Sequence, residues 1–343
     1  MRVLYTSDLH GDFRLYQELC VLAGSSSADV IVLGGDILPS FAPTKRYEDM
    51  IPYQKVFVEQ SLRPLFSRIT ETTAVRKILT IPGNWDAGYP FLFENPLEAV
   101  VDLTQKVHPL ENGFELIGYP FIPPTPFRPK DYEKMDDPES PWPPQKNPSY
   151  VRSHDNPDQV MPIDPIAYLR QRETIQTDLD DLIKPTHFRK AIYIMHSPPH
   201  GTRLDLIYGR THAGSRSIAR FIKRNQPLVT LHGHIHEAPE VSGAYLDRIG
   251  ETLCINPGQL TFTERGPSKL SAVVFDVENP VATLQHTNFQ RGSRFEVRKI
   301  SFATRKTEKN NHVDKCFHSI PYLFCAYAPF SAGRAGGGME PPV

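Results

Sequence analysis

The sequence has few cysteines and no closely spaced pair of them. Four cysteines lie among 343 residues, and no two form a Cys-x-x-Cys pair. Zinc ribbons depend on such pairs, and disulfide-stabilised secreted domains are small and rich in cysteine. The sequence therefore predicts reduced thiols at Cys20, Cys254, Cys316 and Cys325 rather than a disulfide framework or a zinc ribbon.

Long hydrophobic runs and an excess of charge of one sign are also missing. No segment approaches the roughly 18 consecutive apolar residues of a membrane span. The N-terminal stretch MRVLYTSDLHGD reaches two acidic residues by position 12, without the apolar core of a signal peptide. The formal net charge is -1, whereas dedicated nucleic-acid-binding surfaces usually need a basic excess. We expect a cytoplasmic protein without a membrane or nucleic-acid partner, and the sequence carries no signal that identifies a protein partner.

What the first third of the sequence does contain is an alternation of apolar strands and helices. We expect strands at 2–6, 29–35 and 76–83 and helices at 12–24 and 54–70. Continuous Val, Ile and Leu runs separated by helices are typical of a sheet that is covered on both faces. The pattern therefore predicts an α/β fold.

The alternation continues in the second half of the chain. Asp164 suits the N-cap of the first of these helices, with Ile183 on its buried face. Further strands follow as far as residue 302, so we expect one domain over 1–302 and a disordered tail over 303–343. The predicted elements are a helix at 165–184, a strand at 190–197, a helix at 215–227, a strand at 228–236, and strands in TLCINPG, KLSAVVFDV, VATLQH and FEVRKISF.

Residues 119–165 differ in composition from the rest of the chain. This segment carries thirteen of the 33 prolines, so it cannot form a regular helix or a central strand. Two interpretations are open: a disordered linker, or an ordered excursion over the mouth of an active site. Disordered segments are poor in aromatic residues. The aromatic residues Tyr119, Phe121, Phe127, Tyr132 and Trp142 therefore favour some packing.

Polar side chains of metal-binding type follow most of the predicted strands. Residues two apart in an extended chain point to the same side, so one strand end can offer two ligands. Adjacent strand ends of a mostly parallel sheet also bring distant segments into one crevice. The candidate ligands are Asp8, His10, Asp36, Asn84, His196, His234 and His236.

The chemistry of this set is coherent. Two carboxylates, one amide oxygen and four imidazoles, without a thiolate, suit Mn, Fe, Zn or Co. Seven ligands are too many for one ion and suit two ions that share a carboxylate. Two such ions, about 3.5–4 Å apart, clamp the attacking and leaving oxygens of a phosphoryl group.

In this order, the motifs resemble those of the calcineurin-like metallophosphoesterase superfamily. That family's pattern is D-x-H, G-D, G-N-H-(D/E), a histidine after a strand, and G-H-x-H. The resemblance spans residues 1 to about 260. Here the motifs read Asp8-Leu9-His10, Gly35-Asp36, Gly83-Asn84-Trp85-Asp86, His196 and Gly233-His234-Ile235-His236.

The resemblance implies a four-layer α/β/β/α sandwich with two mixed central sheets. It also implies two divalent transition-metal ions, with manganese favoured, and a metal-bridging hydroxide as the nucleophile. Asp36 would bridge the ions. Carried over by position, Asp8, His10, Asp36 and His236 would hold one ion, and Asp36, Asn84, His196 and His234 the other.

Trp85 marks a departure from the family pattern, because much of the family has a histidine there. Indole has an N–H donor but does not titrate, so Trp85 cannot act as a general acid. Three interpretations are open: another residue is the acid, no acid is needed, or Trp85 stacks on the substrate. His212, in the loop GRTHAGS, is the first candidate acid. His200 is a second candidate, or a substrate or structural residue, and Asp86 orients a ligand histidine or braces the loop.

The function that the resemblance implies is hydrolysis of phosphodiesters or small-molecule phosphates. The proline-rich excursion, by narrowing the mouth, would favour small molecules. Two alternatives remain: a scaffold module of the same fold, with or without metal, and a nuclease. The complete ligand set speaks against the first, and the near-neutral charge against the second.

Overall fold

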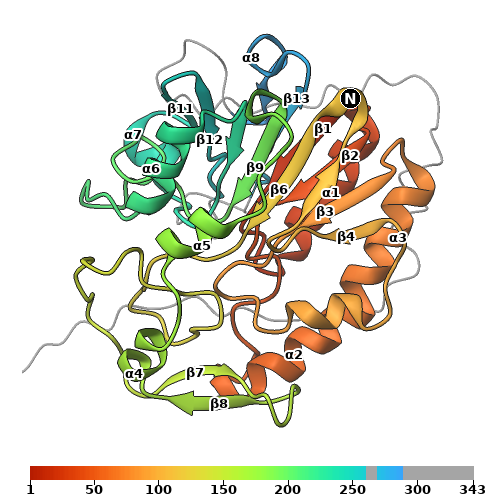
Figure 1. The fold of residues 1–343 in the computed structure, drawn as a ribbon. Coiled ribbons are helices and arrows are strands. Elements are labelled where there is room, and N and C mark those ends of the chain that lie inside the picture. Colours follow the sequence, from red (N-terminus) through yellow and green to blue (C-terminus); the bar gives the residue numbers. More distant parts are fainter. Residues whose placement is uncertain (260–268, 289–343) are drawn as a thin grey trace, which may run out of the picture.

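The structure is a computed structural model that describes residues 1–259 and 269–288. Two six-stranded mixed sheets lie at its centre with helices on their outer faces (Figure 1). The expected four-layer α/β/β/α architecture is therefore confirmed. The strand expected in FEVRKISF and the tail 303–343, with Cys316 and Cys325, lie outside the described residues.

The first sheet consists of β1 (Arg2–Thr6), β2 (Val30–Leu33), β3 (Lys77–Thr80), β4 (Val100–Asp102), β13 (Val273–Asp276) and β14 (Gln285–His286). Its order is β14–β13–β1–β2–β3–β4. The strands β1 to β4 run parallel, and β13 pairs antiparallel with β1. The carboxyl ends of β1, β2 and β3 therefore lie at the same edge.

The second sheet consists of β5 (Val107–Pro109), β6 (Glu115–Tyr119), β9 (Ala191–Met195), β10 (Val229–Leu231), β11 (Leu246–Ile249) and β12 (Thr252–Ile255). Its order is β11–β12–β10–β9–β6–β5. Its four inner strands run parallel, and both edge strands are antiparallel to their neighbours. The carboxyl ends of β9 and β10 are therefore neighbours.

Three buried clusters separate the four layers. The middle cluster packs one sheet on the other, and the outer two pack each sheet on its helices. Alternate residues of β1 divide between clusters, because side chains of a strand point alternately to its two faces. Val3 and Tyr5 pack in the middle cluster, and Leu4 packs against the outer helices.

Each outer layer is formed by only a few helices. The helix expected at 54–70 falls on α2, a π-helical stretch and α3. The first sheet is covered by α1 (Phe13–Ser25), α2 (Met50–Phe57), η2 (Val58–Leu62) and α3 (Arg63–Thr72), and the second by α5 (Ile175–Asp181) and α6 (Arg216–Asn225). Shorter helices are α4 (Pro165–Arg170), α7 (Ala238–Ser242), α8 (Pro280–Thr283), η1 (Tyr47–Asp49), η3 (Tyr89–Phe93), η4 (Glu111–Gly113) and η5 (Phe188–Lys190).

The boundaries of α6 follow from its sequence. The hydroxyl of Ser215 caps its start by accepting a hydrogen bond from Ile218 N at 3.0 Å. The buried residues Ile218, Phe221 and Ile222 follow the three- and four-residue spacing of one helical face. The helix ends at Gln226, which adopts a left-handed conformation with φ 51°.

Two expectations about secondary structure are wrong. The helix expected at 165–184 is split into α4 and α5, because Thr174 caps a new helix by accepting from Thr177 N at 3.1 Å. Ile183 lies beyond α5 and is 56% exposed, so it is not on a buried helix face. The strand expected in VATLQH forms only at its end, as β14, because its first residues belong to α8, where Asn279 is the N-cap and Pro280 the first residue.

The proline-rich segment 119–165 contains a two-stranded hairpin formed by β7 (Ser149–Arg152) and β8 (Val160–Ile163). Its contacts reach both halves of the molecule. Lys55 Nζ of α2 lies 2.9 Å from Asp158. At the other half, Asp136 accepts from Arg216 N at the start of α6 at 2.8 Å. The segment thus connects the helical layers of the two sheets.

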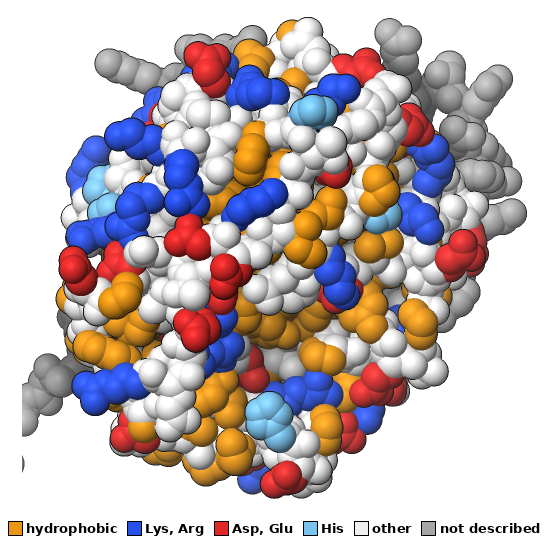
Figure 2. Space-filling model, viewed as in Figure 1, with side chains coloured by type: hydrophobic (Ala, Val, Ile, Leu, Met, Phe, Trp, Pro, Cys, Tyr) orange, Lys and Arg blue, Asp and Glu red, His pale blue; other side chains and the backbone are white. Residues whose placement is uncertain are grey.

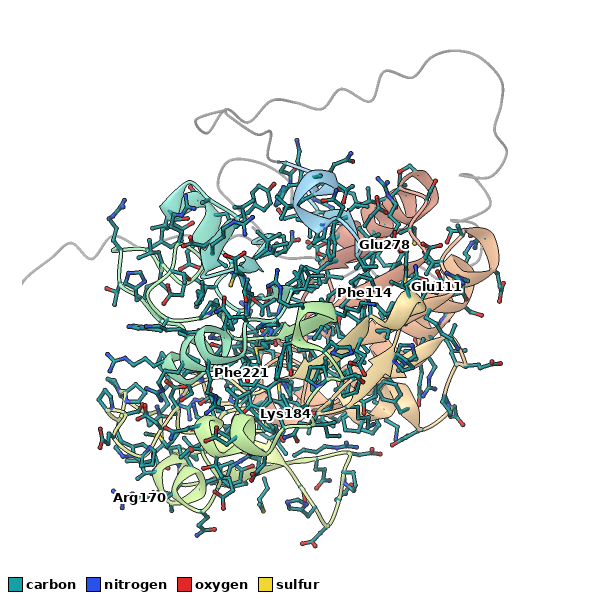
Figure 3. The ribbon with its side chains drawn as sticks, turned by 45° about the horizontal axis from the view of Figure 1, so that its top comes forward. Glu111, Phe114, Arg170, Lys184, Phe221 and Glu278 are labelled. Carbon is teal, nitrogen blue, oxygen red and sulfur yellow. The ribbon has the colours of Figure 1, made fainter. Side chains whose placement is uncertain are left out.

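Polar contacts join the sheets at the end of the strands away from their carboxyl ends. Arg76, just before β3, lies 2.9 Å from Glu111, which follows β5. Asn112 also donates a hydrogen bond to Glu278, which follows β13. Figure 3 shows Glu111 and Glu278 close to each other at this end, while Lys184 and Phe221 lie farther down, on the α5 and α6 side.

The surface differs between the two halves. On the face in Figure 2, lysine and arginine side chains gather at the upper left, over α6 and α7. Hydrophobic side chains are more frequent in the lower half, where Figure 1 places α2, α4 and the β7–β8 hairpin. Among the described residues, no helix is both long and apolar enough to cross a membrane.

Candidate metal centre

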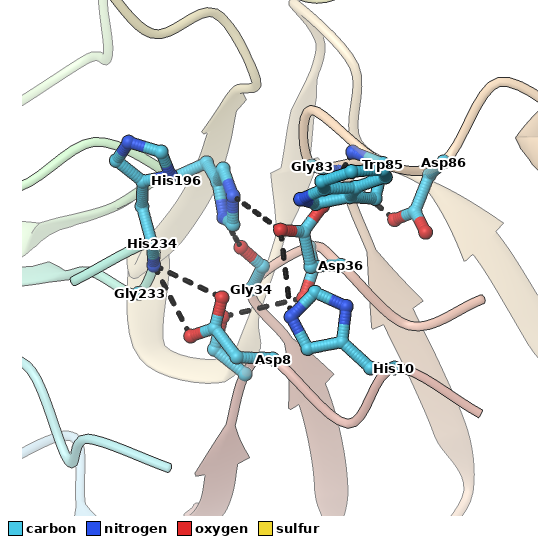
Figure 4. A network of polar contacts seen from close by, with 12 residues as sticks. Asp8, His10, Gly34, Asp36, Gly83, Trp85, Asp86, His196, Gly233 and His234 are labelled. Atoms are coloured by element: carbon cyan, nitrogen blue, oxygen red, sulfur yellow. Dashed lines mark hydrogen bonds and ion pairs between the residues drawn. The ribbon is translucent and has the colours of Figure 1, made fainter. Parts of the chain in front are cut away.

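The predicted ligands lie in the loops that follow five strands. The loops after β1, β2 and β3 belong to the first sheet, and the loops after β9 and β10 to the second. Because each set of strands is parallel and the sheets pack face to face, these loops meet at one edge of the sandwich (Figure 4).

Six of the seven predicted ligands come together in two groups. Within each group, the donor atoms all lie within 4.8 Å of one another. Asp36 belongs to both groups. Its Oδ2 lies 3.7 Å from His10 Nε2 and 3.5 Å from His196 Nε2 (Figure 4). The groups are Asp8, His10, Asp36 and His236, and Asp36, His196 and His234.

Asn84, the seventh predicted ligand, is buried between residues that contact Asp36. Its side-chain oxygen and nitrogen have no hydrogen-bond partner among the described residues. His196 Nε2 is likewise buried without a hydrogen-bond partner in the described part of the chain, although Asp36 Oδ2 lies 3.5 Å away. Buried polar atoms are nearly always satisfied by protein, water or an ion. These unsatisfied atoms, together with the nitrogen and oxygen donor set, fit a bound cation.

Four of the predicted ligands have an unfavourable backbone conformation. The φ angles are 60° at Asp8, 45° at His10, 50° at Asp36 and 65° at His234. Residues other than glycine rarely adopt this left-handed region, and it costs about 1–3 kcal/mol for each residue. Such conformations cluster at functional sites, where the surrounding structure enforces them.

Two glycines of the motifs are required by close packing. A Cβ atom at Gly83 would collide with the carboxylate and backbone of Asp36 and lie 2.6 Å from His196 Nε2. A Cβ atom at Gly233 would collide with Ser7 and Asp8. The glycines in GN and GH therefore allow the loops of the two sheets to approach one another.

Hydrogen bonds on the far side of two imidazole rings fix their orientation. Ser40 Oγ lies 2.6 Å from His10 Nδ1, and the carbonyl oxygen of Gly34 lies 2.8 Å from His196 Nδ1. Each bond leaves Nε2 directed towards Asp36. Sequence reasoning misses Ser40, because a serine after a proline in GGDILPS is typical of any turn.

Two of the histidines are held in the neutral form. Burial lowers the pKa of His10 to about 4, against the opposing effect of Asp36. Burial, together with the neighbouring His196, lowers the pKa of His234 to about 3. A neutral imidazole can bind a cation without first losing a proton.

The other two histidines pair with the carboxylates. Although burial opposes it, Asp36 raises the pKa of His196 to about 9. In the same way, Asp8 raises the pKa of His236. The histidines in turn lower the pKa of both carboxyl groups, despite the burial of Asp8 and Asp36. Cation binding at these imidazoles would compete with their protonation.

The model of one protein family, described as calcineurin-like phosphoesterase, matches residues 1–238, which is more than half of the chain. The chain belongs to the calcineurin-like phosphoesterases. This family generally binds divalent metal ions, and the two donor groups are candidate sites for them.

Solved structures resemble this chain at low sequence identity. One shares 20% identity, covers 83% of this chain and 97% of that chain, and gives a TM-score of 0.50. The protein TT1561 of Thermus thermophilus shares 16% identity over 83% and 97% of the two chains, with a TM-score of 0.47. A dimetal phosphatase from Danio rerio shares 10% over 80% and 92%, with a TM-score of 0.43. No curated protein matches the chain.

Asp86 braces the GNWD loop of this phosphoesterase. Its carboxylate accepts hydrogen bonds from Gly83 N at 2.9 Å, Ile37 N at 3.1 Å and Leu38 N at 2.8 Å. Of the two roles considered for Asp86, the structure shows the brace. It ties the loop after β3 to the loop after β2, and so fixes Asn84 beside Asp36.

Trp85 is mostly buried, with 8% of its surface exposed. Its backbone N–H donates to Asp36 Oδ1 at 2.8 Å, and its carbonyl accepts from Gln54 Nε2 at 2.7 Å. The indole ring lies 4.9 Å from the ring of Phe41 and 5.4 Å from that of Phe127. The backbone of Trp85 therefore holds the shared carboxylate, and its ring belongs to an aromatic cluster.

The remaining predicted residues, His212 and His200, form a separate cluster around Asp205. His212 Nδ1 lies 2.7 Å from Asp205 Oδ1, and His200 Nδ1 lies 3.5 Å from Asp205 Oδ2. Asp205 is fully buried and also accepts from Thr202 N at 3.1 Å and Gly214 N at 3.1 Å. Neither histidine belongs to the two donor groups. Sequence reasoning misses Asp205, because its role depends on its contact with His212, seven residues further along the chain.

This second cluster is attached to the loop that holds His234 and His236. The fully buried Asn256 donates from Nδ2 to the carbonyl oxygen of Leu204 at 3.1 Å, and to those of Gly233 at 3.3 Å and Ile235 at 3.1 Å. The loop 200–214 is therefore fixed against the loop after β10, on the side of the second sheet.

Proposed function

We propose that this phosphoesterase hydrolyses phosphodiesters or small-molecule phosphates with two divalent transition-metal ions, manganese being our first choice. The observation that carries the proposal is that one carboxylate, Asp36, is shared by two groups of nitrogen and oxygen donors. Such a donor set, without thiolate, suits Mn, Fe, Zn or Co.

The residues that would hold the ions fall into two sets that share Asp36. When bound, two divalent ions lower the pKa of water and stabilise negative charge on the phosphoryl oxygens. The two aspartates carry a charge of −2, so the loaded site keeps a positive charge that attracts a phosphoester. The sets are Asp8, His10, Asp36 and His236, and Asp36, Asn84, His196 and His234.

The chain itself must orient the site and manage the protons. Ser40 and the carbonyl of Gly34 hold His10 and His196 in place, and Asp86 holds the GNWD loop. Trp85 cannot give a proton to the leaving oxygen, because the indole N–H does not titrate. The proton must therefore come from another residue or from water.

We assign proton donation to His212. Asp205 Oδ1 lies 2.7 Å from His212 Nδ1 and can accept a hydrogen bond from it, so a protonated imidazole keeps Nε2 free to give its proton to the leaving oxygen. His200, whose ring lies 5.5 Å from that of His212, would contact the substrate.

Asp36→Asn tests the shared carboxylate. After manganese reconstitution, the wild-type chain should hold about two ions per chain and hydrolyse a model diester, a model monoester, or both. Asp36→Asn should hold less metal and lose turnover. Asp155→Asn is the control, because Asp155 is an exposed aspartate. Full activity in Asp36→Asn would show that the assignment of Asp36 is wrong.

His212→Ala tests the acid. Because a poor leaving group needs protonation, turnover of an alkyl ester should fall by about 10²–10⁴-fold. Turnover of a p-nitrophenyl ester, whose leaving group is stable as an anion, should change little. Unchanged turnover of the alkyl ester would remove His212 from the mechanism.

A further inference from the structure

An aromatic cluster lies directly beside the candidate metal centre. The indole of Trp85 contacts the phenyl rings of Phe41 and Phe127, with centroid distances of 4.9 and 5.4 Å and interplanar angles of 58° and 49°. The three rings come from the loop after β2, the loop after β3 and the proline-rich segment. Both phenyl rings therefore contact the same indole.

The two phenyl rings of this cluster are exposed, whereas the indole beneath them is covered. Phe41 is 40% exposed and Phe127 is 42% exposed, compared with 8% for Trp85. Exposed aromatic surface is unfavourable in water, although a single exposed ring is common and needs no explanation. Two such rings packed on one indole instead provide apolar faces near each other, to which a further flat ring can pack in offset or edge-on geometry.

The cluster is connected by single hydrogen bonds to the residues that would hold the metal ions. Trp85 N–H donates to Asp36 Oδ1 at 2.8 Å. Ser40, the residue before Phe41, contacts His10 Nδ1 at 2.6 Å. A phosphoester held at Asp36 would therefore have its organic group within reach of these rings.

Phe127 is placed by a fully buried ion pair. Lys130 Nζ lies 2.7 Å from Glu133 Oε2, and neither side chain is exposed. Both side chains hold Thr125. Lys130 Nζ donates to the carbonyl oxygen of Thr125 at 2.8 Å, and the backbone N–H of Thr125 donates to Glu133 at 3.0 Å. Thr125 Oγ1 in turn accepts from Phe127 N at 3.2 Å. Buried ion pairs contribute little net stability. We therefore assign this pair a positional role, which is to fix the turn that carries Phe127.

Phe41 is supported in a similar way. The ring of Tyr47 lies 5.7 Å from that of Phe41, edge-on. Tyr47 also stacks on Tyr150 of β7, with a centroid distance of 5.1 Å and an interplanar angle of 13°. The proline-rich segment therefore contributes to the position of both exposed rings. It contains Phe127 itself, and its Tyr150 supports Phe41 through Tyr47.

We infer that Phe41, Trp85 and Phe127 form a subsite for a flat aromatic group of the substrate, next to the phosphoryl position. The substrate class is then a phosphoester with an aryl group or a nucleobase, rather than a purely aliphatic one. This inference rests on the proposed function, because it places the phosphoryl group at Asp36.

Ligand binding that is detected by fluorescence tests the subsite without turnover. The chain has two tryptophans, so Trp142→Phe leaves Trp85 as the single indole. In this background, loaded with manganese, we would titrate phenylphosphonate and methylphosphonate, which carry the same phosphoryl group. The phosphonate analogue of adenosine 5′-monophosphate is a third ligand, which distinguishes a single ring from a nucleobase.

Phenylphosphonate or the adenosine analogue should bind at least about five-fold tighter than methylphosphonate and change the Trp85 emission. Phe41→Ala and Phe127→Ala should each reduce this preference, with metal content and circular dichroism unchanged. Phe13→Ala is the matched control, since Phe13 is 38% exposed on α1 and lies outside the cluster.

Three outcomes would overturn the inference. If the aromatic and methyl ligands bind equally, the subsite does not exist, while the proposed phosphoryl site stands. If the preference survives in both phenylalanine variants, other residues bind the aromatic group. If no phosphonate binds to the manganese-loaded chain, the proposed function fails together with the inference.

Discussion

Single residues of this site combine unusual backbone conformations with very close packing. Asp8, His10, Asp36 and His234 all adopt positive φ angles, which side-chain chemistry alone does not favour. Gly83 lies so close to Asp36 and His196 that no side chain fits there. The strain is tolerated because the loops are fixed from both sides, by Asp86 and by the neighbouring sheet.

Gly83→Ala tests this close packing. The added Cβ collides with backbone and carboxylate atoms of Asp36, which cannot move aside without displacing the ligand. We expect the free energy of unfolding to fall by about 1–3 kcal/mol, as in other overpacked sites, and the metal content to fall as well. Urea unfolding and metal analysis measure the two effects.

Gly24→Ala is the matched control, because a Cβ at Gly24 in α1 meets no atom within 4 Å. Alanine is the better helix former, so this variant should be more stable by about 0.5–1 kcal/mol. If Gly83→Ala binds metal and unfolds like the wild-type chain, the close approach of the loops is not required.

Among the elements, the short edge strand β14 joins the two sheets near their margin. It pairs with β13 in the first sheet, while the ring of His286 lies 4.5 Å from that of Tyr245, just before β11 of the second. His286 Nε2 also lies 3.0 Å from the carbonyl oxygen of Pro257. Burial lowers the pKa of His286 to about 4. Acid should therefore loosen this connection.

His286→Gln tests the pH dependence. Between pH 6.5 and 4 the unfolded chain binds a proton at His286 and the folded chain does not, so the free energy of unfolding falls as the pH falls. Between pH 7 and 5 this amounts to on the order of 1–2 kcal/mol. The variant should lose that part of the acid sensitivity in urea unfolding with a chelator present.

His154→Gln serves as the control, because His154 is exposed. Its acid sensitivity should equal that of the wild-type chain. If the pH profile of His286→Gln is unchanged, His286 is not the histidine whose protonation lowers the free energy of unfolding in acid.

For the whole molecule, the site spans the join between two sheets. Asp8, His10, Asp36 and Asn84 follow strands of the first sheet, whereas His196, His234 and His236 follow strands of the second. Bound cations would therefore connect both halves and satisfy atoms that are otherwise buried without partners.

Removal of metal should accordingly lower the thermal stability of the whole chain. At free metal concentrations of about 100 times Kd, binding contributes about 2.7 kcal/mol, or roughly 5–10 °C in Tm. Calorimetry with a chelator, and then with manganese restored, measures the shift. Asp36→Asn should show a smaller shift. An equal Tm with and without metal would mean that cations do not stabilise the native fold.

The sequence alone determined the α/β fold class, because this depends on local pattern, whereas the metal-ligand roles stay a prediction. Apolar runs predicted β1, β2, β3, β9 and β10, and motif order predicted the residues that now form the two donor groups. It failed at the break between α4 and α5 and at α8, where capping residues prevailed over hydrophobic pattern.

Only the tertiary structure decided how those residues meet other parts of the chain. Ser40 on His10, Asp205 on His212, and Phe127 over Trp85 are contacts between segments that local pattern does not link. Such contacts depend on how the sheets and the proline-rich segment pack, and packing is a property of the whole chain rather than of any stretch within it. The departure at Trp85 is visible in the sequence, but its place between a shared carboxylate and two exposed rings is visible only in the folded molecule.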